Sequence, residues 1–198
     1  MLFRSPLPPG LIDVATRLPV RVELKYATKD NFMKRDVYGS WTRCVLVEDA
    51  VHILEAAHAA LVARNPALTF VLYDCARPRS VQMQMWDVVK GTPQQGYVAD
   101  PTRPPGSVHN RGCAVDLTLY DLKTGQAVEM PSGYDEFSDR AYADYPGGTS
   151  RQRWLRDLLR KAMESEGFAV YEEEWWHFDY KDWSKYRIGT QTFEELGK

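Results

Sequence analysis

The sequence predicts a single α+β domain, with a central antiparallel sheet flanked by helices. Apolar residues recur at helical spacing in some segments and form alternating or short β-rich runs in others. These elements follow one another without a regular strand–helix–strand repeat, which favours α+β over α/β. The 198 residues can bury a full core, and no internal repeat, low-complexity tract or long linker divides them. We therefore expect one domain over residues 1–198.

Each element has its own local signal. Alternation and β-rich apolar runs indicate strands, helical periodicity with a capping residue indicates helices, and Pro- and Gly-rich polar stretches indicate loops. In chain order, we expect a strand over 20–26, a helix over 47–64 with Asp49 as N-cap, a buried strand over 68–73, a helix over 80–90, a loop over 94–106, a strand over 113–120 with a short return over 126–130, an irregular segment over 134–149, a helix over 150–165 capped by Ser150, and a final strand segment over 168–180.

Composition excludes several classes of partner. The chain carries 25 basic and 27 acidic residues with no basic run, which argues against a nucleic-acid or anionic-membrane partner. No apolar run approaches the roughly 18 residues of a membrane span, and prolines interrupt the apolar residues before position 19, so no signal peptide is expected. The oligomeric state cannot be read from the sequence.

The cysteines bear on the compartment. Cys44, Cys75 and Cys113 are odd in number and widely spaced, which is typical of buried thiols and not of a disulfide framework. An additional thiolate ligand would close a catalytic metal site, so we expect structural roles for Cys75 and Cys113. Free thiols predict a reducing compartment, and hence a cytoplasmic location.

Two of the four histidines stand in unusual contexts. His109, Asp116 and His177 form a set of two imidazoles and one carboxylate, which suits one zinc ion with a fourth position left open. There are two ordinary alternatives. His177, beside the tryptophans, could be only a packed residue, and Asp116 could form an ion pair with Arg111. His52 and His58, six apart on the expected helix, are expected to be surface or boundary residues.

Spacing restricts how this set can assemble. His109 and Asp116 are seven residues apart and would face opposite sides of one continuous strand. The chain must therefore turn between them, and Gly112 supplies the flexible point. Glu174 and His177 are three apart, so the same argument predicts a bulge or bend between them.

One pattern joins these residues: Ser107-x-His109-x-x-Gly112-x-Ala114-x-Asp116, followed by Glu174-x-Trp176-His177. It resembles the D-alanyl-D-alanine dipeptidases of the VanX type, within the wider group of zinc peptidases that includes D,D-carboxypeptidases and the Hedgehog zinc domain. The resemblance covers roughly residues 23–178. Further matching segments are KYATKDNF over 25–32, YDCARP over 73–78, DLTLY over 116–120 and GYDEF over 133–137.

The resemblance implies a role for each matching residue. His109, Asp116 and His177 correspond to the zinc ligands, Glu174 to the catalytic base, and Arg77 to the arginine that stabilises the transition state. Ser107 matches a residue that contacts the substrate carboxylate, and Tyr26 and Asp135 match positions near the free amino group. Cys75 and Cys113 depart from the small residues expected there, and the segment after Lys181 has no counterpart.

The implied activity is zinc-dependent hydrolysis of D-Ala-D-Ala or a similar small D,D-dipeptide. Such an enzyme removes a cell-wall precursor, either in glycopeptide resistance or to use D-alanine. The alternatives are a D,D-carboxypeptidase on longer peptidoglycan peptides and a zinc-binding module without catalysis. A pocket closed by the 94–106 and 134–148 loops would argue against the carboxypeptidase. Glu174 and Arg77 would be unnecessary in a module without catalysis.

Overall fold

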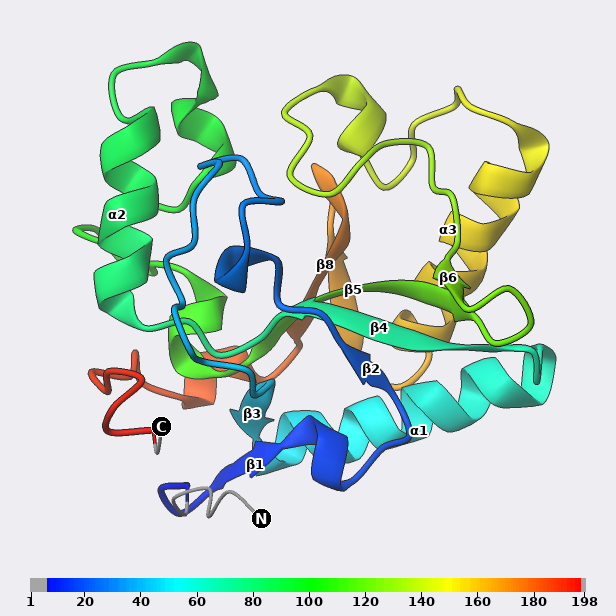
Figure 1. Cartoon of the computed structure of the whole chain (residues 1–198), viewed down its shortest axis with the longest axis horizontal. Coiled ribbons are helices and arrows are strands. Elements are labelled where there is room, and N and C mark those ends of the chain that lie inside the picture. The colour runs from blue at the N-terminus through cyan, green and yellow to red at the C-terminus, as the bar shows by residue number, and fades with distance from the viewer. Residues whose placement is uncertain (1–6, 197–198) are drawn as a thin grey trace.

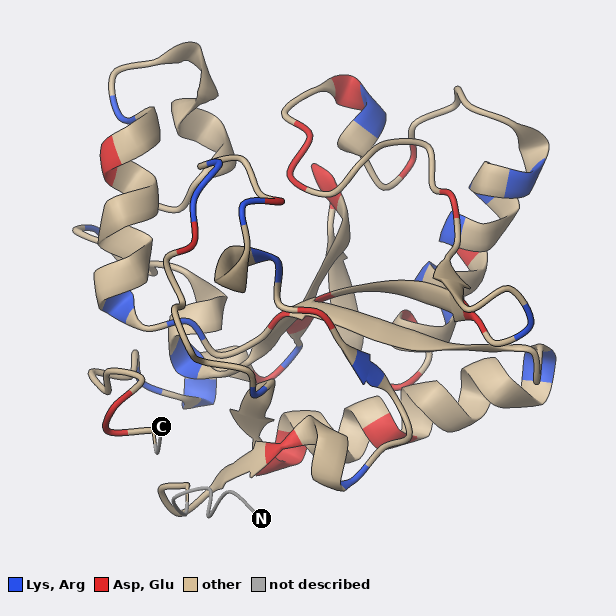
Figure 2. Ribbon diagram, viewed as in Figure 1, with Lys and Arg blue, Asp and Glu red and all other residues tan. Residues whose placement is uncertain are grey.

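The structure is a computed structural model that describes residues 7–196, shown in Figure 1. The expectation that no signal peptide is present concerns residues 1–6 in part, and these lie outside the described residues. Within the described range, no helix has the length and apolar content needed to cross a membrane. Figure 2 shows acidic and basic residues interspersed along the ribbon.

A six-stranded sheet forms the centre of the fold, in the order β2-β4-β5-β8-β7 with β6 paired to β5. Its strands are β2 (Arg21–Val22), β4 (Leu68–Asp74), β5 (Ala114–Asp121), β6 (Gln126–Ala127), β7 (Phe168–Tyr171) and β8 (Glu174–Tyr180). Neighbouring strands run antiparallel except β2 and β4, which are parallel. A separate antiparallel pair joins β1 (Leu11–Asp13) to β3 (Val45–Val47). The α+β fold class is confirmed, with one parallel pair added.

Three helices accompany the sheet: α1 (Glu48–Arg64), α2 (Arg79–Val89) and α3 (Ser150–Glu164). Helices α1 and α3 pack against each other and against strands of the sheet. Helix α2 lies apart from them and contacts the 3-10 turn over residues 93–97 (Figure 1). Strand β4 is buried throughout and β5 along nearly its whole length, and most of their residues are apolar.

Helix ends differ from the expectation by one or two residues. Val47 is the N-cap of α1, and Asp49 lies in the first turn, where its negative charge interacts favourably with the positive end of the helix dipole. Thr149, not Ser150, caps α3, because its hydroxyl accepts a hydrogen bond from the backbone N–H of Gln152 in a capping box. Trp154 on α3 is 54% exposed.

Three strand predictions were wrong in extent. The alternation over 20–26 gives only the two residues of β2, because a 3-10 turn, η2 (Lys25–Ala27), follows and buries Tyr26. The segment over 168–180 is not one strand but the hairpin of β7 and β8. The return over 126–130 is likewise only the two residues of β6.

The expectation of a surface or boundary position was wrong for His58. It is buried between α1 and β4, where its Nε2 lies 2.9 Å from the Thr69 hydroxyl oxygen. The Thr69 hydroxyl donates in turn to the carbonyl of Pro19, so the buried ring has a polar partner. His52 is exposed, as expected.

The cysteine prediction was also wrong for two of the three residues. Cys44 and Cys75 form a disulfide with their Cα atoms 5.3 Å apart, and Cys113 remains a buried free thiol. Burial raises the pKa of the Cys113 thiol to about 12, so it stays protonated. The disulfide joins the segment before β3 to the end of β4, next to Arg77.

We expect reduction of the Cys44–Cys75 bond to lower the free energy of unfolding. The bond closes a loop with a sequence separation of 31 residues, and the loss of that constraint on the unfolded chain costs about 3.7 kcal/mol. Urea unfolding with and without reductant measures the difference, and a Cys44→Ala/Cys75→Ala variant should no longer respond to reductant. Identical wild-type curves in both conditions would contradict the bond.

Candidate active site

Three of the predicted site residues converge from different elements. His109 lies on a 3-10 turn, η4 (Val108–Arg111), Asp116 on β5 and His177 on β8. Gly112 ends η4 at φ 66°, a left-handed conformation that glycine adopts without strain, so the chain turns between His109 and Asp116 as expected. The register of the sheet pairs Asp116 with His177 on the neighbouring strand.

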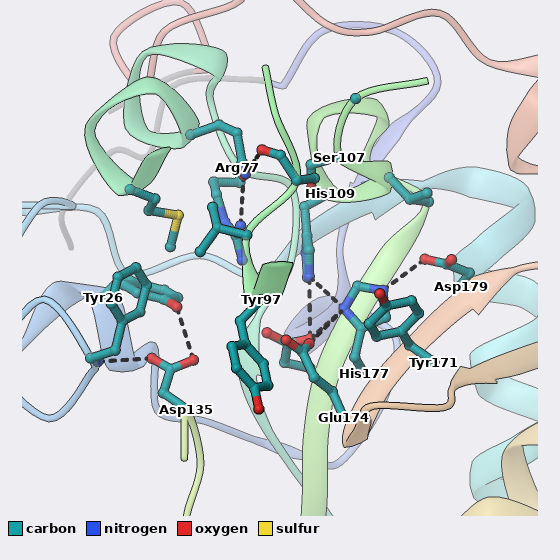
Figure 3. A pocket seen from close by; sticks show the side chains of 18 of the residues that line it. Tyr26, Arg77, Tyr97, Ser107, His109, Asp135, Tyr171, Glu174, His177 and Asp179 are labelled. Carbon is teal, nitrogen blue, oxygen red and sulfur yellow. Dashed lines mark hydrogen bonds and ion pairs between the residues drawn. The ribbon is translucent and has the colours of Figure 1, made fainter. Parts of the chain in front are cut away.

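The ligand atoms form a tight triangle, visible in Figure 3. His109 Nε2 lies 3.2 Å from Asp116 Oδ1 and 3.1 Å from His177 Nδ1, and the third side, from His177 Nδ1 to Asp116 Oδ1, is 3.0 Å. In a tetrahedral zinc site with bonds of about 2.0–2.1 Å, neighbouring ligand atoms lie about 3.3 Å apart. The triangle therefore has nearly the size that a metal ion requires.

The hydrogen bonds on the outer side of each ring leave the inner nitrogens able to hold a cation. His109 Nδ1 lies 2.8 Å from the carbonyl oxygen of Cys75, and His177 Nε2 lies 2.8 Å from Asp179 Oδ1. Both oxygens only accept, so these two nitrogens carry the ring protons in the neutral histidines. The inner nitrogens then present lone pairs to each other and to the Asp116 carboxylate, an arrangement that a bound cation satisfies.

Asp116 is buried and carries the negative charge of this group. Burial by itself raises the pKa of a carboxyl, but His109 and His177 beside it lower the pKa of Asp116 well below its usual range. Its second oxygen accepts a hydrogen bond of 2.8 Å from the Tyr134 hydroxyl. The expected alternative of a pair with Arg111 is not formed, because Arg111 donates to the carbonyls of Tyr186 and Pro105.

Glu174 lies beside the triangle at the start of β8. The pairing of β7 with β8 shifts between Val170 and Tyr171, so that Tyr171 is opposite Glu174 while Val170 is opposite Phe178. This irregularity is the predicted bulge, and it places Glu174 Oε2 3.8 Å from His177 Nδ1 despite their odd spacing. Burial raises the pKa of Glu174 to about 8.

Arg77 is a buried cation held by several side chains. Its Nε and Nη2 donate to Asp74 Oδ2 over 2.9 and 2.6 Å, and its Nη1 donates to Gln82 Oε1 over 2.7 Å. Tyr38 donates to the other oxygen of Asp74. A guanidinium has five N–H groups, so two remain after these three bonds. Arg77 can therefore offer two donors to a further ligand.

Asp135 forms a second acidic position, away from the triangle. Its Oδ1 accepts a hydrogen bond of 3.0 Å from the Tyr26 hydroxyl, and its Oδ2 accepts one of 3.1 Å from the backbone N–H of Phe32. Burial raises the pKa of Asp135 to about 7. Its φ of 56° is unusual for a residue other than glycine, and such backbone conformations are typical of functional sites.

All eight predicted site residues line one cavity of about 200 Å³. Ser107, 7% exposed, precedes η4, and its hydroxyl does not cap that turn. Over the cavity, Tyr97 of the turn η3 (Pro93–Tyr97) stacks on Phe137, with ring centres 4.7 Å apart and an interplanar angle of 7°. Tyr97 lies in the 94–106 loop and Phe137 in the 134–148 loop, so these two loops meet at this contact. A cavity below the about 300–1,000 Å³ typical of drug-sized ligands suits a small molecule.

Sequence reasoning missed the partners that hold these residues. Asp74 binds Arg77, Tyr134 binds Asp116, and Asp179 binds His177. The register places Asp74, Asp116 and His177 side by side across β4, β5 and β8. Asp74 three residues before Arg77 was the one local signal available, since a buried strand seldom ends in an unpaired carboxylate.

Comparisons with known proteins find one family and several relatives to which this chain is similar. The family model described as D-ala-D-ala dipeptidase matches residues 9–195. A D-alanyl-D-alanine dipeptidase of Escherichia coli is 35% identical over 92% of this chain and 91% of its own length. One from Enterococcus faecalis is 34% identical over 82% of this chain and 87% of its own. The crystal structure of the vancomycin-resistance D,D-dipeptidase VanXYg with a D-Ala-D-Ala phosphinate analogue is 20% identical, with a TM-score of 0.45, and covers 70% of this chain and 51% of that one.

Proposed function

The chain belongs to the D-Ala-D-Ala dipeptidase family, and from this premise we propose that it is a zinc enzyme that hydrolyses D-Ala-D-Ala or a similar small D,D-dipeptide. The observation that carries the proposal is the triangle of His109, Asp116 and His177 with Glu174 at its side, inside a small cavity. The family is metal-dependent, and two imidazoles with one carboxylate are a ligand set that zinc uses in catalytic sites.

The residues of the chain divide the chemistry among them. His109, Asp116 and His177 would hold the zinc ion, which would act as a Lewis acid and lower the pKa of a water molecule to about 7. Glu174 is placed to take a proton from the attacking water and to pass it to the leaving amine. Hydrolysis of an amide develops negative charge on the carbonyl oxygen, and the two remaining N–H groups of Arg77 are suited to stabilise it.

The ends of the cavity fit the two charges of a free dipeptide. Asp135, supported by Tyr26, offers a carboxylate to the substrate ammonium, and Ser107 offers a hydroxyl to the substrate carboxylate. A peptide whose amino group is acylated has no positive charge for Asp135, and the stacked Tyr97 and Phe137 restrict the space for a longer chain. The arrangement therefore favours a dipeptidase over a D,D-carboxypeptidase.

One experiment tests the proposal against its alternatives. Purified protein is analysed for zinc and assayed on D-Ala-D-Ala beside N-acetyl-D-Ala-D-Ala. We expect one zinc per chain and hydrolysis of the free dipeptide alone. Cleavage of the acetylated substrate would favour the carboxypeptidase, and a zinc-loaded protein that cleaves neither would favour the module without catalysis.

The Asp135 carboxylate gives a pH dependence that can be checked. Because burial raises its pKa to about 7, the group loses its charge as the pH falls below that value, and the KM for D-Ala-D-Ala should rise. The charged and titratable groups near it are Tyr26 on η2 and, across the cavity, Arg77, Asp116 and Glu174. Zinc in the site would lower the pH at which this rise in KM occurs, since a nearby cation stabilises the charged form of a carboxylate.

An Asp135→Asn variant isolates this effect from the titration of other groups. We expect its KM to be raised about 10–100-fold at neutral pH, because one charge-assisted hydrogen bond is lost, and to show no further rise at lower pH. Steady-state kinetics from pH 5 to 9 measure both properties, with the exposed Asp139→Asn as control. A wild-type KM in Asp135→Asn would show that the ammonium binds elsewhere.

The cellular setting follows from the substrate and the cysteines. Hydrolysis of D-Ala-D-Ala removes a cell-wall precursor, which serves glycopeptide resistance or the use of D-alanine. The cytoplasmic location predicted from three free thiols loses that support, because disulfides such as Cys44–Cys75 are typical of oxidising compartments.

A further inference from the structure

Asp179 contacts a metal-site histidine from outside the group assigned above. It lies two residues after His177 on β8, so both side chains project from the same face of the strand. Asp179 Oδ1 is 2.8 Å from His177 Nε2, and Figure 3 shows this contact on the side of the ring opposite the triangle.

We propose that Asp179 is a positioning residue, which holds His177 in the tautomer and ring orientation that direct the Nδ1 lone pair to the metal position. A carboxylate cannot donate, so the hydrogen bond places the ring proton on Nε2. Nδ1 is then left free of a proton and aimed at Asp116 and His109. Outer partners of this kind fix the ring and make the histidine a stronger ligand.

The two histidines differ in how much the fold itself restrains them. The His109 side chain is 2% exposed, and a backbone carbonyl, that of Cys75, accepts its outer N–H. The His177 side chain is 13% exposed at the edge of the cavity, with the ring of Tyr171 at 5.8 Å and an interplanar angle of 70°. The outer N–H of His177 is therefore held by a side chain, whereas the outer N–H of His109 is held by a backbone carbonyl.

Substitution of Asp179 should leave the strand intact. Its backbone pairs with Ala114 of β5 on one side and Ala169 of β7 on the other, and these ladder positions do not involve the carboxylate. The Asp179 side chain is 23% exposed, so its removal opens no buried cavity. A loss of metal affinity in a variant would then reflect the missing hydrogen bond.

The experiment measures zinc binding directly. Zinc-free wild type, Asp179→Ala, Asp179→Asn and the control Asp182→Ala compete for zinc with a chromogenic chelator. Asp182 is an exposed carboxylate that pairs with Lys185, so its loss changes the net charge equally without touching His177. We expect about 10–100-fold weaker zinc binding in Asp179→Ala and wild-type affinity in Asp182→Ala. The amide oxygen of Asp179→Asn still accepts a hydrogen bond and should restore part of the loss.

Urea unfolding of the zinc-free proteins separates positioning from folding. We expect similar unfolding curves for wild type and Asp179→Ala, together with a changed visible spectrum of the cobalt-substituted variant. Wild-type zinc affinity in Asp179→Ala, or a loss matched by lower stability of its zinc-free form, would overturn the inference. The inference rests on the metal site of the proposed function, but a wild type that binds zinc and leaves D-Ala-D-Ala intact would refute the dipeptidase alone.

Discussion

Replacement of Glu174 by glutamine is expected to lower kcat for D-Ala-D-Ala by about 10²–10⁴-fold while zinc remains bound. This is the usual contribution of a positioned general acid–base group. Glutamine has almost the shape of glutamate and can still form hydrogen bonds, but its amide cannot accept a proton from water. The expected loss therefore concerns the chemical step and not the cavity.

The position of Glu174 explains why binding should survive the change. Its carboxylate lies 3.8 Å from His177 Nδ1, beside the triangle but outside the set of three ligand atoms. Removal of its charge leaves two imidazoles and Asp116 to hold the metal. The substrate contacts proposed for Asp135 and Ser107 lie on other segments, so KM should change little.

The matched control for this variant is Glu172→Gln, two residues earlier in the turn between β7 and β8. Glu172 is exposed, and the same substitution there should leave kcat and KM at their wild-type values. Zinc content of both variants is determined alongside the kinetics. Full activity of a zinc-loaded Glu174→Gln would assign the proton transfer to another group and refute the proposed mechanism.

The sequence allowed the conformation around the site to be predicted where spacing conflicted with regular structure. His109 and Asp116 are seven positions apart, which required a turn at Gly112. Glu174 and His177 are three positions apart, which required a bulge or bend, and both irregularities are present. Such arguments succeed because strand geometry has a strict period of two residues, so a side chain on the wrong face demands a local irregularity.

Interactions between distant segments could not be predicted in the same way. Cys44 and Cys75 are 31 residues apart, and only the packing of β3 beside the end of β4 brings them together. The contact of Tyr134 with Asp116 depends equally on tertiary structure. The hairpin over 168–180 lacks the Gly or Asn signal of a tight turn, since Glu172 and Glu173 lie between its strands, and it was therefore taken as one strand.

Arg77→Lys is expected to lower kcat/KM for D-Ala-D-Ala by about 10²–10³-fold, the usual cost of removing one transition-state donor. Lysine keeps a positive charge beside Asp74, but it has three donors on one nitrogen instead of a planar group of five. An ammonium that binds Asp74 and Gln82 cannot also present two N–H groups to the oxygen of the scissile carbonyl.

Lysine is more informative here than alanine. Arg77→Ala would leave the carboxylate of Asp74, which is fully buried, without its cation, and breaking a buried pair in this way costs about 3–5 kcal/mol of stability. Loss of activity in that variant could then reflect unfolding. Kinetics of Arg77→Lys are read beside its urea unfolding curve and beside Arg79→Lys, an exposed arginine two residues later that donates to the carbonyl of Pro101. A wild-type kcat/KM in Arg77→Lys would show that charge alone suffices and that the two free N–H groups do not stabilise the transition state.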